Sequence, residues 1–201
     1  MPFGPKKGFS DFIRGVRARA MMDACAYAAE IGRPLNVAVD INWSRTSAGE
    51  DEKGLLFASF RKAAGRFLRE RGAEGLTCIW ARELPPAPVP RPNAHLNLYV
   101  PARLFDTFVK HAHTFLPAGC VGLSSESVYI QAIGGTGGDH IRRNEYLVKG
   151  AHPKARLKIK RARSFQGRII GKRCGTSEDI GPSARLAAAE RIEVAIATIP
   201  Y

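Results

Sequence analysis

Residues 94–101 read AHLNLYVP, and this stretch decides the fold that we expect. In an extended chain successive side chains point to opposite faces, so His95, Asn97 and Tyr99 share one face while the apolar residues between them share the other. A strand of this kind packs one side on a core and leaves polar groups on the other. We therefore predict a β-strand here, ended by its proline, with candidate functional residues on its polar face.

The neighbouring segments alternate between strand and helix periods. Residues 35–43 (LNVAVDINW) alternate like a half-buried strand with Asp40 on its polar side, and shorter strands are expected at 76–80 and 128–133. Residues 84–93 hold five prolines and predict a stiff loop that joins two strands as a hairpin. Apolar residues at helical spacing predict helices at 10–31 (with Ser10 as N-cap), 55–71, 105–115, 139–149 and 182–196.

These elements predict an α+β fold, with one central, mainly antiparallel sheet and helices packed on one of its faces. We expect an N-terminal helix in residues 1–34, the core in residues 35–150, and a basic segment with a C-terminal helix in residues 151–201. The glycine-rich run at 134–138 is expected to act as a hinge before the helix at 139–149.

The chain is strongly basic, and the excess charge is local. Lys and Arg number 31 against 18 Asp and Glu, a net charge of +13, and residues 142–173 hold twelve basic residues with Glu145 as their one acid. Such a stripe indicates a polyanionic partner, most simply nucleic acid, although a solvated surface would also account for it. The expected DNA contacts are Arg142, Arg143, Lys154, Arg156, Lys158, Lys160, Arg161, Arg163, Lys172 and Arg173.

Other features exclude classes of protein. No window approaches the ~18 apolar residues of a membrane span, and the first residues lack the apolar run of a signal peptide, so we expect no membrane partner. Cys25, Cys78, Cys120 and Cys174 form no CxxC pair and are expected to be reduced thiols. We expect a cytoplasmic protein.

The polar face of residues 94–101 is the first candidate site. The proline loop can bring Glu83 alongside His95, and a carboxylate, an imidazole and the amide oxygen of Asn97 together suit a divalent ion such as Mg²⁺ or Mn²⁺. The alternative is that these are ordinary polar residues on a solvent-facing strand.

The helix expected at 139–149 is the second candidate site. Its periodicity places Tyr146 and Lys149 side by side with Arg142, away from the apolar side of the helix. Positive charge favours the phenolate form of a tyrosine, so Tyr146 is a candidate nucleophile. The alternative is a half-buried tyrosine whose hydroxyl reaches the surface.

The order of these two motifs resembles that of the HUH endonucleases, and more narrowly the rolling-circle replication initiators of plasmids and phages. In that family a strand with the pattern His-hydrophobic-His binds the metal, and the tyrosine of a Tyr-x-x-Lys helix attacks DNA. The resemblance covers residues 35–149. It implies that His95, Asn97 and Glu83 hold the metal, with Asn97 standing where the family has its second histidine, and that Tyr146 and Lys149 are nucleophile and helper.

The resemblance implies an enzyme that nicks single-stranded or hairpin origin DNA through a 5′-phosphotyrosine intermediate. Such an enzyme would start rolling-circle replication of a plasmid or phage-like element in a bacterium, together with host replication proteins. The alternative is a non-catalytic DNA- or RNA-binding protein on the same scaffold, which the asparagine at position 97 would favour.

Overall fold

The structure is a computed structural model. It describes residues 8–44, 46, 48–86, 92–116, 127–134, 137–159 and 163–197, and structural statements below concern these residues.

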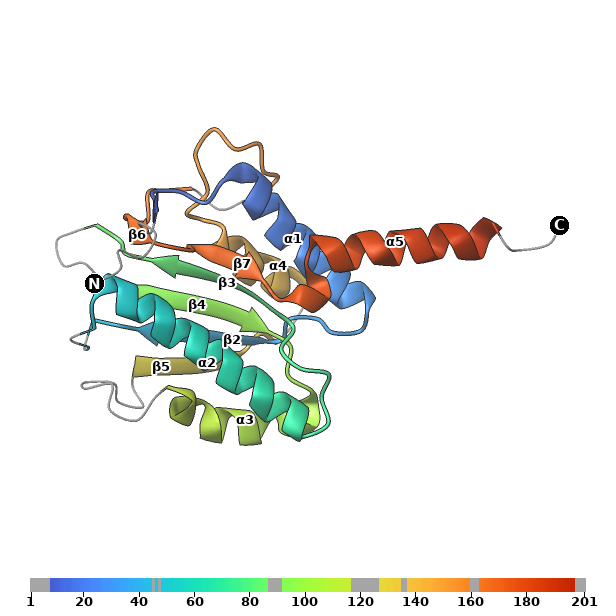
Figure 1. The fold of residues 1–201 in the computed structure, drawn as a ribbon, viewed down its shortest axis with the longest axis horizontal. Helices are drawn as coiled ribbons and strands as arrows, with labels where there is room; N and C mark the ends of the chain where they lie inside the picture. The colour runs from blue at the N-terminus through green and yellow to red at the C-terminus, as the bar shows by residue number, and fades with distance from the viewer. Residues whose placement is uncertain are drawn as a thin grey trace, which may run out of the picture.

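A five-stranded sheet forms the centre of the molecule (Figure 1). Every neighbouring pair of its strands is antiparallel, which confirms the predicted α+β class. The hairpin across the proline loop is confirmed as well, because Glu83 pairs with Asn93. In spatial order the strands are β5 (Val128–Ala132), β2 (Val37–Asn42), β4 (Asn93–Leu98), β3 (Cys78–Glu83) and β7 (Cys174–Thr176).

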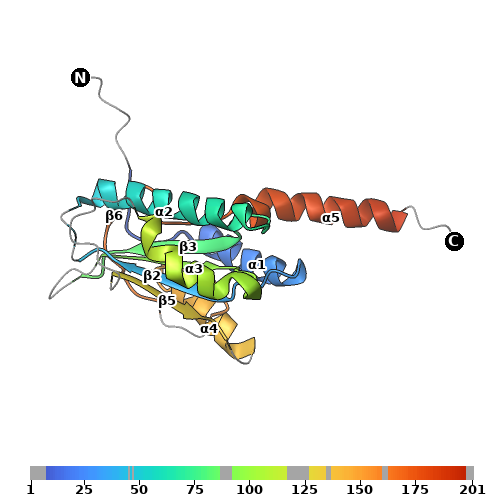
Figure 2. The ribbon, with the colours of Figure 1, turned by 90° about the horizontal axis from the view of Figure 1, so that it is seen from below.

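Helices cover both faces of this sheet, so the prediction that they pack on one face alone is wrong; the polar face of β4 is covered as well. In Figure 1, α2 crosses the front of the sheet and α4 lies behind it, and Figure 2 shows the two on opposite sides. Packing contacts place α3 on the α2 side and α1 on the α4 side. The five α-helices are α1 (Gly15–Glu30), α2 (Glu50–Glu70), α3 (Phe105–Ala112), α4 (Gly137–Leu147) and α5 (Pro182–Ala197).

The core between the sheet and α2 and α3 is rich in aromatic side chains. Edge-on ring contacts join Phe57 to Trp80 (5.5 Å) and Phe60 to Phe115 (5.6 Å). The apolar rows of β2 and β4 complete this core, as their alternation predicts. We define it as the aromatic core.

The core between the sheet and α1 is built from small residues. Ala18, Ala24 and Ala28 of α1 are fully buried and pack toward Ile79 and Ala81 of β3. Short side chains let the helix backbone approach the sheet closely, which explains the run of alanines. We define this layer as the alanine core; Leu147 and Val148, at the end of α4, also belong to it.

The first helix begins later than expected. Ser10 is not its N-cap, because Phe9–Ser10 form strand β1 and pair with β6 (Ile169–Ile170). The helix starts at Gly15, after Arg14 as N-cap residue, and no described side chain caps it.

The segment after residue 150 contributes to the same fold. Its strand β7 pairs with the edge of β3, where Gly175 is needed because an added Cβ would lie 3.0 Å from the Trp80 ring. At Gly167, which has a φ of 72°, an added Cβ would overlap the carbonyl oxygen of Leu84. Beyond β7, α5 runs outward past the sheet (Figure 1). Among the described helices, none combines the length and apolar character needed to cross a bilayer.

Candidate active site

Polar side chains gather on the sheet face that α4 covers. Asp40 on β2 and His95 on β4 are direct partners across the two strands, and His95 is in turn paired with Ala81 of β3. Glu83, two residues further along β3, lies on the same face, because side chains alternate along a strand. His95 and Glu83 are 4% and 3% exposed, so ionic groups are buried here in the middle of the fold.

His95 lies between two carboxylates. Its Nδ1 is 2.5 Å from Oδ1 of Asp40, and its Nε2 is 3.2 Å from Oε2 of Glu83. Ionised carboxylates only accept hydrogen bonds, so both ring nitrogens donate when the imidazole is protonated. Burial disfavours the charged imidazolium, but the hydrogen bonds and charges of the two carboxylates outweigh it and raise the pKa of His95 above its ordinary value.

The two carboxylates respond in the opposite direction. Burial works against their ionisation, but His95, together with Arg143 at Asp40 and Lys149 at Glu83, lowers the pKa of both groups below their ordinary values. Each of the three groups therefore favours the charged form of the others.

Helix α4 brings the second predicted motif onto this cluster. The Tyr146 ring meets the His95 ring edge-on, with centroids 5.0 Å apart and planes at 90°. Nζ of Lys149 lies 3.5 Å from the centre of the Tyr146 ring and 2.8 Å from Oε2 of Glu83. Tyr146 and Lys149 thus face the polar row of the sheet, and four of the five predicted catalytic and metal-binding residues lie together.

A pocket opens beside Tyr146, between the end of β5 and α4. Its volume is about 330 Å³, and Arg142, Arg143 and Gln131 line it with Tyr146. Nη2 of Arg143 also donates to Oδ2 of Asp40 at 2.6 Å, and its guanidinium lies 5.2 Å from the Tyr146 ring centre. The tyrosine therefore lies between a buried charge cluster and an open pocket that is lined by two arginines.

Asn97 is not gathered with the other candidate ligands. It pairs with Ile79 of β3, on the opposite side of His95 from Glu83 along the strands. Its Nδ2 donates to Oδ1 of Asn144 on α4 at 2.9 Å, so this buried pair connects the sheet to the helix.

The donor set near His95 can be compared with what a metal ion requires. Asp40 and Glu83 approach opposite ring nitrogens, so they cannot both join His95 around one ion, and the described residues hold no group of three or more His, Cys, Asp or Glu arranged as ligands. On the Glu83 side, however, the carboxylate oxygen Oε1 is buried without a hydrogen-bond partner among the described residues. A buried carboxylate oxygen that lacks a donor suits a hard cation, so Glu83 and Nε2 of His95 fit Mg²⁺ or Mn²⁺ as a partial site.

The predicted DNA contacts fall into three groups. Lys154, Arg156, Lys158, Lys172 and Arg142 are exposed, as a contact surface requires. Arg143, Arg163 and Arg173 are engaged within the protein, whereas Lys160 and Arg161 lie outside the described residues.

The arginines in the second group have structural partners. Arg173 is 4% exposed, and its guanidinium donates to the carbonyl groups of Gln166, Gly167 and Ser10. Arg163 donates to carbonyl groups of the loop after α4. The density of basic residues therefore overstates the number that face solvent, because two of them hold loops in place.

Asp40 is the site residue to which the sequence assigned no role. It is the one charged residue in the alternating stretch 35–43, and a lone charge on a half-buried strand is a signal that could have identified it. Its partner Arg143 could not be identified this way, because that pairing joins residues 103 positions apart.

Comparisons of the chain with family models, with curated proteins and with solved structures give no match.

Proposed function

We propose that this chain is a metal-dependent endonuclease that nicks single-stranded DNA, with Tyr146 as the nucleophile. The observation that carries the proposal is the contact between Tyr146 and His95, because it joins two motifs some fifty residues apart in the sequence. A tyrosine kept only for packing has no need of a lysine over its ring and a buried imidazole at its edge.

The reaction would be an in-line transesterification. The phenolic oxygen of Tyr146 forms a bond to phosphorus, the bond from phosphorus to the 3′ oxygen breaks, and the tyrosine proton ends on that oxygen. The products are a 5′-phosphotyrosine link and a free 3′-hydroxyl group, which a polymerase can extend. Because the link keeps the energy of the phosphodiester bond, the step needs no nucleotide cofactor.

The surrounding side chains have separate tasks. Lys149 stabilises negative charge that develops on the phenolic oxygen, and Arg142 and Arg143 hold the scissile phosphate in the adjoining pocket. Asp40 is a positioning residue, because it orients both His95 and Arg143. Glu83 and His95 would hold the divalent ion, which when bound polarises the phosphate as a Lewis acid.

The biological setting is taken from the resemblance to the rolling-circle replication initiators, and this chemistry agrees with it. A free 3′-hydroxyl group on a nicked strand primes synthesis, so the proposed enzyme starts rolling-circle replication of a plasmid or phage-like element. It would act in the bacterial cytoplasm on single-stranded or hairpin origin DNA, with host replication proteins extending the new end.

The proposal is tested by trapping the covalent product. The protein is incubated with Mn²⁺ and a 3′-labelled single-stranded DNA library of randomised sequence, and label that stays with the protein on a denaturing gel is measured. We expect the wild type to retain label and Tyr146→Phe to lose it, since the substitution removes one hydroxyl group and keeps the ring. Tyr99→Phe and Tyr129→Phe are matched controls that should retain the label. No adduct with the wild type, or an unchanged adduct with Tyr146→Phe, would overturn the proposal.

A second candidate function is DNA or RNA binding without cleavage. The hydrogen bond from Asn97 to Asn144 favours it, because this side chain serves helix packing instead of joining His95 and Glu83. Restoring the imidazole with Asn97→His separates the two functions. An endonuclease should keep or increase Mn²⁺ affinity, measured by calorimetry, because the imidazole offers the ion a good ligand at a position where the amide is bonded to Asn144. Salt-sensitive DNA binding with no adduct and no Mn²⁺ binding in either form would support the binding protein.

A further inference from the structure

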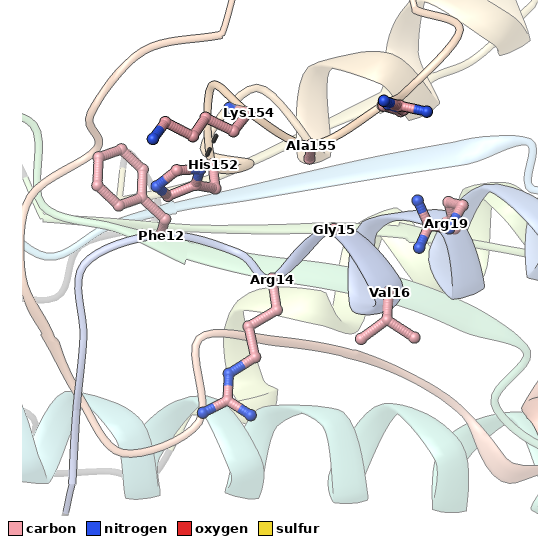
Figure 3. Close-up of a pocket in the computed structure, with 9 residues that line it drawn as sticks. Phe12, Arg14, Gly15, Val16, Arg19, His152, Lys154 and Ala155 are labelled. Carbon is pink, nitrogen blue, oxygen red and sulfur yellow. Dashed lines mark hydrogen bonds between the residues drawn. The ribbon is translucent and has the colours of Figure 1, made fainter.

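A second basic pocket lies away from Tyr146, at the start of α1. Its volume is about 570 Å³, and it is formed by residues 12–19 on one side and by the loop of residues 152–156 on the other (Figure 3). Its nine lining residues include four Arg or Lys and no acidic residue: Phe12, Arg14, Gly15, Val16, Arg19, His152, Lys154, Ala155 and Arg156.

The two sides of this pocket are fixed to each other and to the end of α4. Ile13 and Ala151 form a parallel bridge, in which the Ile13 N–H donates to Gly150 (2.8 Å) and the His152 N–H donates to Ile13 (3.0 Å). The loop then passes so close to α1 that a Cβ on Gly15 would lie 3.0 Å from that of Ala155. The loop that forms one side of the pocket therefore begins six residues after Tyr146 and is fixed against α1.

The cations of this pocket are not neutralised within the described part of the chain. Arg14, Arg19, Lys154 and Arg156 are all exposed, and none of them forms an ion pair with a described residue. Four like charges around one hollow repel each other, and an anion with several negative oxygens relieves that repulsion. Arginine binds phosphate groups, as it binds carboxylates, through paired hydrogen bonds, and a nucleic acid strand supplies several phosphates in a row.

Aromatic rings lie among these cations. The Phe12 ring meets His152 edge-on at 5.1 Å and Phe165 at 5.5 Å. In Figure 3, Lys154 extends on one side of the Phe12 and His152 rings and Arg14 on the other. Aromatic side chains flanked by cations are typical of single-strand binding sites, where bases stack on rings while phosphates contact basic groups.

We infer that this pocket binds one unpaired nucleotide of single-stranded DNA. The base lies against Phe12 and His152, and its two flanking phosphates contact Arg14 and Lys154. The volume lies within the roughly 300–1,000 Å³ of small-ligand pockets, so it suits a nucleotide. The bases of a duplex are already stacked on one another and are not free to enter it. The inference rests on the proposed function and adds to it a second binding site for the single-stranded DNA. Its test measures binding and requires no cleavage.

The test separates base contacts from phosphate contacts. Fluorescence anisotropy with EDTA present compares three probes: a single-stranded thymidine oligonucleotide, an abasic oligonucleotide of equal length, and a duplex. For Phe12→Leu we expect about tenfold weaker binding of the thymidine oligonucleotide, the range of one lost stacking contact, and little change for the abasic strand. His152→Leu, at an exposed ring, repeats the test should Phe12→Leu fail to fold.

Charge is tested with a second pair of variants. The double variant Arg14→Gln with Lys154→Gln should bind both the thymidine and the abasic oligonucleotide more weakly. It should also reduce the slope of log affinity against log salt concentration by about 1.4, at about 0.7 for each phosphate contact. The matched control, Lys62→Gln with Arg66→Gln on exposed positions of α2, removes the same charge and should leave the affinity almost unchanged.

The outcomes are distinguishable. The inference would be overturned if Phe12→Leu lowered the affinity for the thymidine and abasic strands equally. It would also be overturned if the double variant at Arg14 and Lys154 and the control double variant at Lys62 and Arg66 lost equal affinity. A duplex that binds as tightly as the single strand would also overturn it. Selective loss of base-dependent affinity, in a protein that forms no covalent adduct, would uphold this pocket and remove the proposed nuclease.

Discussion

The face of the sheet under α2 and α3 is filled by aromatic rings in edge-on contact, whereas the face under α1 and α4 combines alanines with buried charges. On the first face Trp80, Phe57 and Phe60 are almost completely buried, and large apolar side chains fill the space between the sheet and the helices. On the second face His95 and Glu83 are almost as deeply buried, although both side chains are ionisable.

The difference indicates which face stabilises the fold and which face would carry out the proposed reaction. Burying aromatic rings contributes free energy of folding directly, while taking charges out of water costs free energy that ion pairs recover only in part. Leu147 and Val148 show that α4 also makes ordinary apolar contacts. The charges concentrate where Tyr146 meets the sheet, so we ascribe them to function.

The largest expected effect on stability comes from the aromatic core. Phe60→Ala removes a fully buried ring that contacts Phe115, and we expect a loss of about 3–5 kcal/mol in the free energy of unfolding, measured by urea titration. Adduct formation should survive under conditions where the variant is folded. A loss below about 1 kcal/mol would show that this core contributes less than its packing suggests.

A smaller loss of stability is expected on the charged face. Glu83→Gln removes the carboxylate shared by His95 and Lys149 but keeps a hydrogen-bonding side chain, so we expect a loss of about 1.5–3 kcal/mol, the range for hydrogen bonds to charged groups, by the same titration. Unlike Phe60→Ala, this variant should lose the covalent adduct. The control Glu52→Gln, at an exposed position of α2, should change stability by no more than about 0.5 kcal/mol and keep the adduct. Full activity in Glu83→Gln would separate the charge cluster from function.

The smallest effect is the pH dependence of the cluster, measured in EDTA as the stability difference between wild type and His95→Gln. The pKa of His95 is raised, so the stability that His95 contributes is complete below the ordinary pKa of 6.5. It is lost as the pH rises through the raised pKa. The pKa values of Asp40 and Glu83 are lowered, so the stability that these carboxylates contribute is present above their ordinary pKa values of 3.8 and 4.5. It is lost as the pH falls through the lowered values. The difference should peak between about pH 4.5 and 6.5, and a difference that grows above pH 7 would contradict the assigned charges.

The sequence predicted those parts of the fold that local periodicity determines. Strict alternation at 35–43 and 94–101 is sufficient to place a strand and its polar face, and helical spacing placed α2 with its start five residues late. The two-residue strands β1 and β6 have no periodicity of their own. They form because two segments about 160 residues apart in the sequence pair with each other. Since Ser10 belongs to this pairing, α1 begins at Gly15 and not, as predicted, after Ser10.

The candidate site was predictable to a similar extent. His95, Glu83, Tyr146 and Lys149 could be selected because each stands in a short motif or directly before a loop that returns the chain. Asp40 and Arg143 form a pair only in three dimensions, and the role of Asn97 depends on Asn144 of another element. Nor could composition distinguish exposed Lys154 from buried Arg173, because Arg173 is buried by folding that brings the carbonyl group of Ser10, 163 positions away, and that of Gly167 onto its guanidinium.

The most direct test of the central claim is to locate the residue that becomes linked to DNA. After reaction with single-stranded DNA and Mn²⁺, the protein is digested with nuclease and trypsin, and the peptides are analysed by mass spectrometry. We predict a nucleotide attached to the peptide of residues 144–149 (NEYLVK), with fragmentation that places it on Tyr146. Attachment to the peptides that contain Tyr99 or Tyr129, or no attached nucleotide at all, would contradict the assignment of Tyr146 as the nucleophile.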